Sequence, residues 1–196
     1  MCGIYFFTKN SLISKENIKK NLKHRGPDYN GQVDLKHSII GFNLLSIREK
    51  IDFSKQPMIT ENENFIIAFN GEIYNTDKLK KQFNFKVSSD SDSEILNRLV
   101  NLKGLDFIKY IKGMYAIILY DKNNKLVHAY RDKSGQKNLY YLEGCEFFII
   151  SSEIHTLFES SILKKKVNYN SIYEACVVGY NPNENTIFSN IKKLLP

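Results

Sequence analysis

MCGIYFFT (residues 1–8) places a cysteine directly behind the initiator methionine and follows it with an apolar run. The run over residues 3–8 predicts a buried first strand. If Met1 is removed, Cys2 carries a thiol and a free α-amino group on the same carbon. Such an amine has an ordinary pKa of about 7.7–8.0 and can act as the base for the thiol, which suits acyl transfer. The alternative is a small buried hydrophobe at the start of a strand, and Cys2 taken alone favours this alternative.

The composition is typical of a globular chain. Of the 196 residues, 42% are hydrophobic and 25% are charged, which is enough for the core of one domain. The formal net charge is +7, but the lysines are spread along the chain. Dispersed lysines indicate a solvated surface, so no nucleic-acid partner is expected.

The sequence carries no membrane signal and no metal signal. No apolar run approaches the roughly 18 residues that span a bilayer, and the N-terminus lacks the pattern of a signal peptide. We therefore expect a cytoplasmic protein without a membrane partner. Cys2, Cys145 and Cys176 are too few and too far apart for a disulfide framework or a zinc pattern. The four histidines are scattered, so no metal site is expected.

Strand-like runs dominate the chain. Strands are predicted over residues 3–8, 37–47, 64–74, 114–121, 125–132, 138–144 and 145–152. Helices are predicted over residues 14–23, within 88–104, and over 105–112 and 153–160. The second of these helices is expected to begin with a capping box of Ser91 and Glu94. Strands that follow one another as hairpins, with helices in separate pairs, favour an α+β fold in which helices cover two antiparallel sheets.

FNGEIYN (residues 69–75) is a candidate oxyanion-binding segment. Asn70 and Gly71 follow an apolar run, so an amide side chain and a flexible backbone N–H could converge at the end of a strand. The alternative is a type I′ hairpin turn, for which Asn-Gly between apolar flanks is a strong signal. The segment taken alone favours the turn.

Two charged segments leave similar alternatives open. Asp92 falls in the first turn of a predicted helix, where it could receive a substrate ammonium group or be stabilised by the helix N-terminus alone. Arg25 and Asp28 in RGPD (residues 25–28) could form a salt-bridged loop.

The joint occurrence of these motifs resembles a known family. The segments MCGI, RGPD, QPM (56–58), FNGEIYN, SDSE (91–94), GMYAIILYD (113–121) and RDKSGQKNLYY (131–141) follow one another in this order. Together they resemble a class II glutamine amidotransferase domain of the N-terminal nucleophile (Ntn) hydrolase type. Within that class they are similar to the glutaminase domain of asparagine synthetase B-type enzymes, as are SSEIHTL (151–157) and NTIFSNIKKLLP (185–196). The resemblance implies one domain, 1–196, with an αββα sandwich in which two antiparallel sheets lie between helical layers.

The resemblance also implies roles for single residues. Cys2 would be the nucleophile that forms a glutamyl thioester from L-glutamine and releases ammonia. Asn70 and Gly71 would hold the oxyanion. Glu72 and Asp92 would bind the glutamine substrate, and Asp92 would bind the substrate's α-ammonium group.

The resemblance also assigns Arg25 to the substrate site. Arg25 would lie near the nucleophile and order the loop there.

At one position this sequence departs from the family pattern. The matching strand usually reads Arg-Leu-Ser-Ile, whose arginine clamps the α-carboxylate of glutamine, and here Leu44 stands at that position. Loss of such a contact costs about 1.5–3 kcal/mol of binding. Arg48, on the same strand face, is about 13 Å further along and too far to substitute. Weak hydrolysis, another carboxylate-binding group and a different nitrogen donor all stay open.

The implied partner is a C-terminal ATP-dependent synthetase domain in cis, which would use the ammonia to amidate a carboxylate acceptor, with aspartate expected. The chain contains no Ser-Gly-Gly-x-Asp-Ser pyrophosphate loop, so ATP and Mg²⁺ are expected only in that missing domain. Pro196 is interpreted as the boundary of a fragment. A homodimer is left open.

Two other functions compete with the glutaminase. The chain could be a weak or inactive Ntn-fold module with a docking role, which Leu44 favours. It could also be an N-terminal-cysteine amidase for another substrate, such as a peptide, in which case the glutamine contacts would be coincidental.

Overall fold

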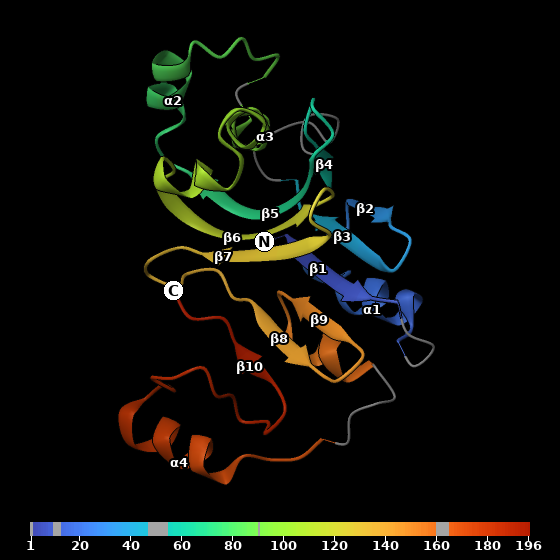
Figure 1. The fold of residues 1–196 in the computed structure, drawn as a ribbon. Coiled ribbons are helices and arrows are strands. Elements are labelled where there is room, and N and C mark those ends of the chain that lie inside the picture. The colour runs from blue at the N-terminus through green and yellow to red at the C-terminus, as the bar shows by residue number, and fades with distance from the viewer. Residues whose placement is uncertain (1, 10–12, 47–54, 90, 160–164) are drawn as a thin grey trace.

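The computed structural model describes residues 2–9, 13–46, 55–89, 91–159 and 165–196. Two antiparallel sheets form its centre (Figure 1). The six-stranded sheet has the order β10-β8-β9-β1-β3-β2, with strands β1 (Gly3–Thr8), β2 (Tyr29–Asp34), β3 (Ser38–Leu44), β8 (Tyr140–Glu143), β9 (Phe148–Ser151) and β10 (Lys192–Lys193). The four-stranded sheet has the order β4-β5-β6-β7, with strands β4 (Met58–Ile59), β5 (Phe65–Ile73), β6 (Gly113–Asp121) and β7 (Leu126–Arg131).

Helices cover the outer face of each sheet. The helices are α1 (Lys15–Asn21), α2 (Thr76–Phe83), α3 (Asp92–Lys103) and α4 (Tyr169–Val178), with 3₁₀ segments η2 (Gly104–Lys109) and η3 (Ile154–Glu159). The α2, α3 and η2 segments pack on the four-stranded sheet, whereas α1 and η3 pack on the six-stranded sheet. Between the sheets lies a third apolar core. This layering confirms the predicted α+β fold with two antiparallel sheets between helical layers.

Strand β1 shows why the opening apolar run belongs at the centre. Successive side chains of a strand point to opposite faces. Ile4 and Phe6 therefore enter the core between the sheets, while Tyr5 and Phe7 enter the core under α1. Because both faces of β1 are covered, the segment needs apolar residues at every position.

Most of the predicted strands and helices are found in the structure, and some observed elements were not predicted. The strands predicted over residues 64–74, 114–121, 125–132 and 145–152 correspond to β5, β6, β7 and β9 within a few residues. Helix α1 begins as predicted at Ser14, whose Oγ accepts a hydrogen bond from Asn17 N at 3.3 Å. The patterns did not predict β2, β4, β10, α2 or α4. Residues 47–54, which include Arg48, lie outside the described part of the chain.

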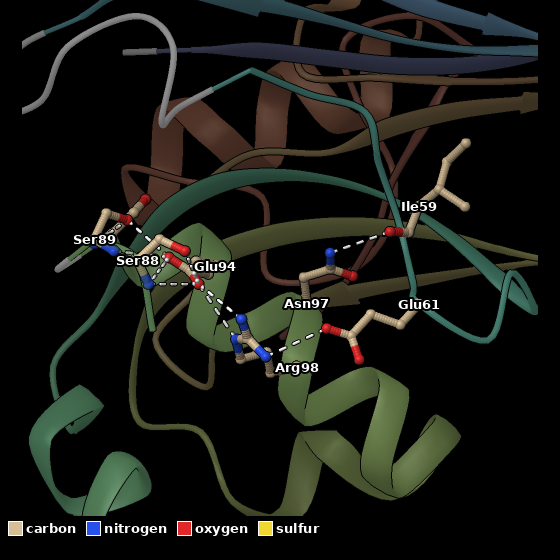
Figure 2. Close-up of polar contacts among 8 residues, drawn as sticks. Ile59, Glu61, Ser88, Ser89, Glu94, Asn97 and Arg98 are labelled. Atoms are coloured by element: carbon tan, nitrogen blue, oxygen red, sulfur yellow. Dashed lines mark hydrogen bonds and ion pairs between the residues drawn. The ribbon is translucent and has the colours of Figure 1, made fainter. Parts of the chain in front are cut away.

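The predicted capping box of α3 is wrong. Ser91 is the N-cap residue but makes no side-chain capping bond. The Glu94 carboxylate instead accepts the backbone N–H groups of Ser88 and Ser89, at 2.9 and 3.0 Å, so it binds the loop before the helix (Figure 2). Those hydrogen bonds lower the pKa of Glu94 even though burial acts to raise it.

Candidate active site

Cys2 lies immediately before β1 and packs half-buried against the core between the sheets. Its Sγ lies 3.8 Å from Leu45 O, to which the thiol donates. Burial raises the pKa of the Cys2 thiol, and the Leu45 bond and the positive charge of Lys137 oppose this rise without cancelling it. A thiol with a raised pKa stays protonated near neutral pH, so its activation needs a nearby base.

Asn70 supplies a hydrogen-bond donor on the side of β5 that faces the core between the sheets, where Cys2 packs. Its side chain is 3% exposed, and its Nδ2 is buried without a hydrogen-bond partner among the described residues. Strand alternation puts Asn70 on the same face of β5 as Ile66 and Ala68, which both belong to the core that Cys2 contacts. An unbonded buried amide costs about 1–3 kcal/mol, which makes it a candidate for a group that binds an incoming oxygen.

Gly71 allows β5 and β6 to approach closely at this point. A Cβ at Gly71 would lie 2.2 Å from Met114 O and 2.7 Å from Tyr115 Cα. Asn70 and Gly71 pair with Ala116 and Tyr115 in the middle of the β5–β6 ladder. The hairpin-turn alternative for Asn-Gly is therefore wrong, and the glycine serves strand packing.

Glu72 lies near the end of β5, and Asp92 is bonded to the same end of this strand. Glu72 shares the strand face of Asn70 and is half-buried. Asp92 begins α3, and its Oδ2 accepts a hydrogen bond from Ile73 N at 3.1 Å. The negative charge of Asp92 acts on Cys2 in the direction that raises the thiol pKa. The structure thus brings Asp92 within electrostatic range of the thiol and links the start of α3 to β5.

Arg25 lies beside β1, because a Cβ built on Gly3 would lie 3.5 Å from Arg25 Cβ. Its guanidinium forms an ion pair with Glu153. His24 and His155 flank the same carboxylate, at 3.6 and 3.7 Å. The salt-bridged loop that RGPD suggested is not what holds Arg25, since its ion-pair partner comes from a segment 128 residues away.

Asp28 of the same motif bonds the backbone on both sides of Leu45, whose carbonyl oxygen accepts a hydrogen bond from the Cys2 thiol. Its Oδ2 accepts a hydrogen bond from Ser46 N at 2.8 Å, and its own N–H donates to Leu44 O at 3.0 Å. The Leu44 side chain is 4% exposed and belongs to the core between the sheets. Position 44 thus places an apolar side chain in the same core between the sheets against which Cys2 packs.

Three further residues that frame this site have no role predicted from the sequence. Gln56, in the QPM motif, is buried and bonds β5 one residue before Asn70. Lys137, in the RDKSGQKNLYY motif, is buried, and its charge opposes the rise in the pKa of Cys2 that burial causes. Asp132 of the same motif accepts Lys137 N at 3.2 Å and so helps to hold this loop. Their only signal in the sequence was membership of motifs that carry the resemblance.

A polar cluster on α3 holds this helix against the segment before β5 (Figure 2). Arg98 donates to Glu94 at 3.1 Å and to Glu61 at 3.3 Å, and Asn97 Nδ2 donates to Ile59 O at 3.2 Å. The cluster lines a cavity of about 200 Å³. Because its charged groups already pair with one another, it serves to position α3 rather than to bind a ligand.

Metal and membrane features are absent from the described part of the chain. No group of three or more His, Cys, Asp and Glu side chains there could hold a metal ion. Within the same residues, no helix has the length and apolar character needed to cross a bilayer.

Comparison with known sequences gives a match over the whole chain. A family model described as a glutamine amidotransferase domain matches residues 1–196. A putative glutamine-hydrolysing asparagine synthetase of Methanocaldococcus jannaschii is 33% identical, over 99% of this chain and 42% of that protein. Glutamine-hydrolysing asparagine synthetase 2 of Bacillus subtilis is 32% identical, over 88% of this chain and 24% of that protein. The chain therefore spans less than half the length of these relatives.

Comparison with solved structures supports the fold. Glutamine phosphoribosylpyrophosphate amidotransferase of Bacillus subtilis, complexed with ADP and GMP, matches with a TM-score of 0.63 at 18% identity. The match covers 85% of this chain and 45% of that chain. This likeness confirms the Ntn-hydrolase sandwich that the resemblance implied.

Proposed function

Because the chain belongs to the glutamine amidotransferase domain family, we propose that it hydrolyses L-glutamine to L-glutamate and ammonia, with Cys2 as the nucleophile once Met1 is removed. The observation that carries this proposal is the buried, unpartnered Nδ2 of Asn70 on the strand face that meets the core beside Cys2. A donor in this situation is suited to an oxyanion, which supplies the missing hydrogen bond.

The chemistry proceeds in two steps. The α-amine of Cys2 takes the thiol proton, and the sulfur attacks the side-chain amide carbon of glutamine. Asn70 Nδ2 and the Gly71 N–H stabilise the oxyanion, the C–N bond breaks, and the proton leaves with ammonia. Water then attacks the glutamyl thioester, the C–S bond breaks, and glutamate leaves with the thiol restored.

Charged residues around the site would orient the substrate. Asp92 is held at the end of β5 and acts electrostatically on Cys2, which supports a role in binding the α-ammonium group of glutamine. Glu72 on the same strand face would assist. Arg25, fixed by Glu153 beside β1, would order the loop next to the nucleophile. Leu44 provides no charge for the α-carboxylate, so we expect a high KM.

The ammonia would pass to a synthetase domain in cis that amidates a carboxylate acceptor. Relatives of more than twice this length are named asparagine synthetases, which supports aspartate as that acceptor. ATP and Mg²⁺ would act only in that domain, and the glutaminase step itself needs no cofactor. Cytoplasmic localisation is expected for such an enzyme.

A second candidate function is that of an Ntn-fold module without activity. The observation that favours it is the apolar, buried Leu44 at the position of the carboxylate clamp. Such a module would dock to its partner domain and release no glutamate.

The test is glutamate release from L-glutamine by protein whose intact mass confirms loss of Met1. Cys2→Ala should abolish release, whereas the matched change Cys176→Ala, at an exposed cysteine, should leave it unchanged. Competition by a glutamine analogue would separate a glutaminase from an amidase for another amide. Absence of glutamate release from correctly processed protein joined to its synthetase domain would overturn the proposal.

A further inference from the structure

The exposed apolar side chains of this chain are concentrated in one segment. Of the fourteen large hydrophobic residues that are exposed among the described residues, eight fall between residues 167 and 187. These eight are Val167, Tyr169, Ile172, Tyr173, Val177, Val178, Tyr180 and Ile187. Scattered exposed hydrophobics need no explanation, but their concentration in one short segment makes this segment a candidate interaction surface.

Helix α4 carries most of this apolar face. It has the sequence YNSIYEACVV, in which Ser171 is its one buried residue. Its one charged residue, Glu174, accepts a hydrogen bond from Asn183 Nδ2 at 3.3 Å. A helix that is apolar around most of its circumference is normally enclosed by other structure. This helix therefore lacks a covering layer within the described chain.

The helix is nevertheless held in a definite place. The Asn168 side chain caps it by accepting Ser171 N at 3.2 Å, and Gly179 ends it in the left-handed conformation. Asn168 N donates to Ile187 O at 2.9 Å, and Phe188 packs edge-on against Phe158 at 4.6 Å between ring centroids. These contacts fix the start of the helix and the segment that follows it, so the apolar face has a definite position, which favours docking of a partner over fraying.

We propose that the apolar face of α4 and its flanks, residues 167–187, is the surface on which the synthetase domain docks. The identity of the partner rests on the proposed function. The occupant is indicated by length, since this chain covers only 42% and 24% of relatives that are named synthetases. In Figure 1 α4 lies at one end of the molecule, and β10 follows it in the chain before the C-terminal end.

Hydrogen exchange tests the proposal directly. The 196-residue chain is measured alone and together with the synthetase domain from the same genome. If one gene encodes both domains, the joined protein is used, and otherwise the synthetase domain is added as a separate chain. Docking predicts that the amides of residues 170–178 exchange at least tenfold more slowly in the combined protein. Equal exchange in both samples would overturn the proposal. Slowing in the 196-residue chain that depends on its own concentration would also overturn it, because a second copy would then be the occupant.

Matched variants separate docking from catalysis. Tyr173→Lys with Val177→Lys changes residues that are 71% and 65% exposed, and Leu102→Lys with Leu126→Lys makes the same change at residues that are 54% and 55% exposed elsewhere. The α4 pair should remove the exchange protection and the glutamine-dependent amidation, and leave glutamate release by the 196-residue chain unchanged. The control pair should change none of these. If no protein releases glutamate, the proposed function fails, while the exchange comparison still decides the docking.

Discussion

The side chain of Gln56 bonds both backbone polar groups of Phe69. Phe69 N donates to Gln56 Oε1 at 2.7 Å, and Gln56 Nε2 donates to Phe69 O at 3.1 Å. The amide group of Gln56 thus takes the place that a neighbouring strand would occupy beside β5. Because Asn70 follows Phe69 directly, this pair sets the position of the strand that carries the candidate oxyanion donor.

Replacing Gln56 should damage both stability and turnover. Gln56→Ala leaves both backbone groups of Phe69 unbonded in a buried place, which costs about 2–3 kcal/mol in the free energy of unfolding. We expect glutamate release to fall more than stability alone explains, because Asn70 loses its support. Urea unfolding and initial rates measure the two effects, with Gln82→Ala, at an exposed glutamine of α2, as the control. Normal turnover in a destabilised Gln56→Ala protein would contradict the positioning role.

Replacing Asn70 should lower kcat with little change in KM. If Nδ2 binds the oxyanion, Asn70→Ala removes an interaction that forms only in the transition state, and kcat should fall about 10²–10³-fold. Because Nδ2 has no hydrogen-bond partner among the residues that the structure describes, stability should not fall in proportion. Steady-state kinetics and thermal melting check this. A large rise in KM at constant kcat would assign Asn70 to ground-state binding instead.

Introducing an arginine at position 44 tests the missing carboxylate clamp. Leu44→Arg should lower the KM for L-glutamine about 10- to 100-fold, since a charge-assisted contact contributes about 1.5–3 kcal/mol. The unliganded protein should be less stable, because the position is buried in the core between the sheets. Leu44→Met, which keeps the apolar character, is the control. An unchanged KM in a folded Leu44→Arg protein would show that another group holds the carboxylate.

Asp132 should contribute stability that depends on pH. Burial by itself acts to raise its pKa, but hydrogen bonds from the N–H groups of Gln136, Lys137, Tyr115 and Ser134 outweigh burial and lower the pKa below the ordinary 3.8. A lowered folded-state pKa gives stability that is present above the ordinary pKa and is lost as the pH falls through the folded value.

Asp132→Asn should therefore destabilise the protein by about 3 kcal/mol at pH 7, through loss of bonds to a charged group. The difference from the unmodified protein should shrink below about pH 4. Unfolding measured from pH 7 to pH 3 tests this, with Asp106→Asn, at an exposed aspartate, as the control. A difference that stays constant with pH would mean that the charge of Asp132 is not the stabilising feature.

Local sequence patterns predict most of the long strands, whereas contacts between distant segments depart from the local predictions. The pattern of apolar residues predicted most long strands, because a strand buried on one face alternates apolar and polar residues and a strand buried on both faces is apolar throughout. The helix within 88–104 was predicted, but its capping box was wrong because Glu94 turns to the preceding loop. A local salt bridge within RGPD was one alternative for Arg25, whereas its ion-pair partner, Glu153, lies 128 residues away.

The sequence by itself determined most of the long strands, the sandwich fold, and the family to which the motifs point, because these depend on short-range patterns and their succession. Only the tertiary structure decided what Asn70 and Gly71 do. Asn-Gly favours a turn locally, but the backbone of β6 comes within the space that a Cβ at Gly71 would need, and the ladder continues through both residues. Packing between distant strands outweighs the local turn preference, and it leaves Asn70 buried with an Nδ2 that has no partner among the described residues.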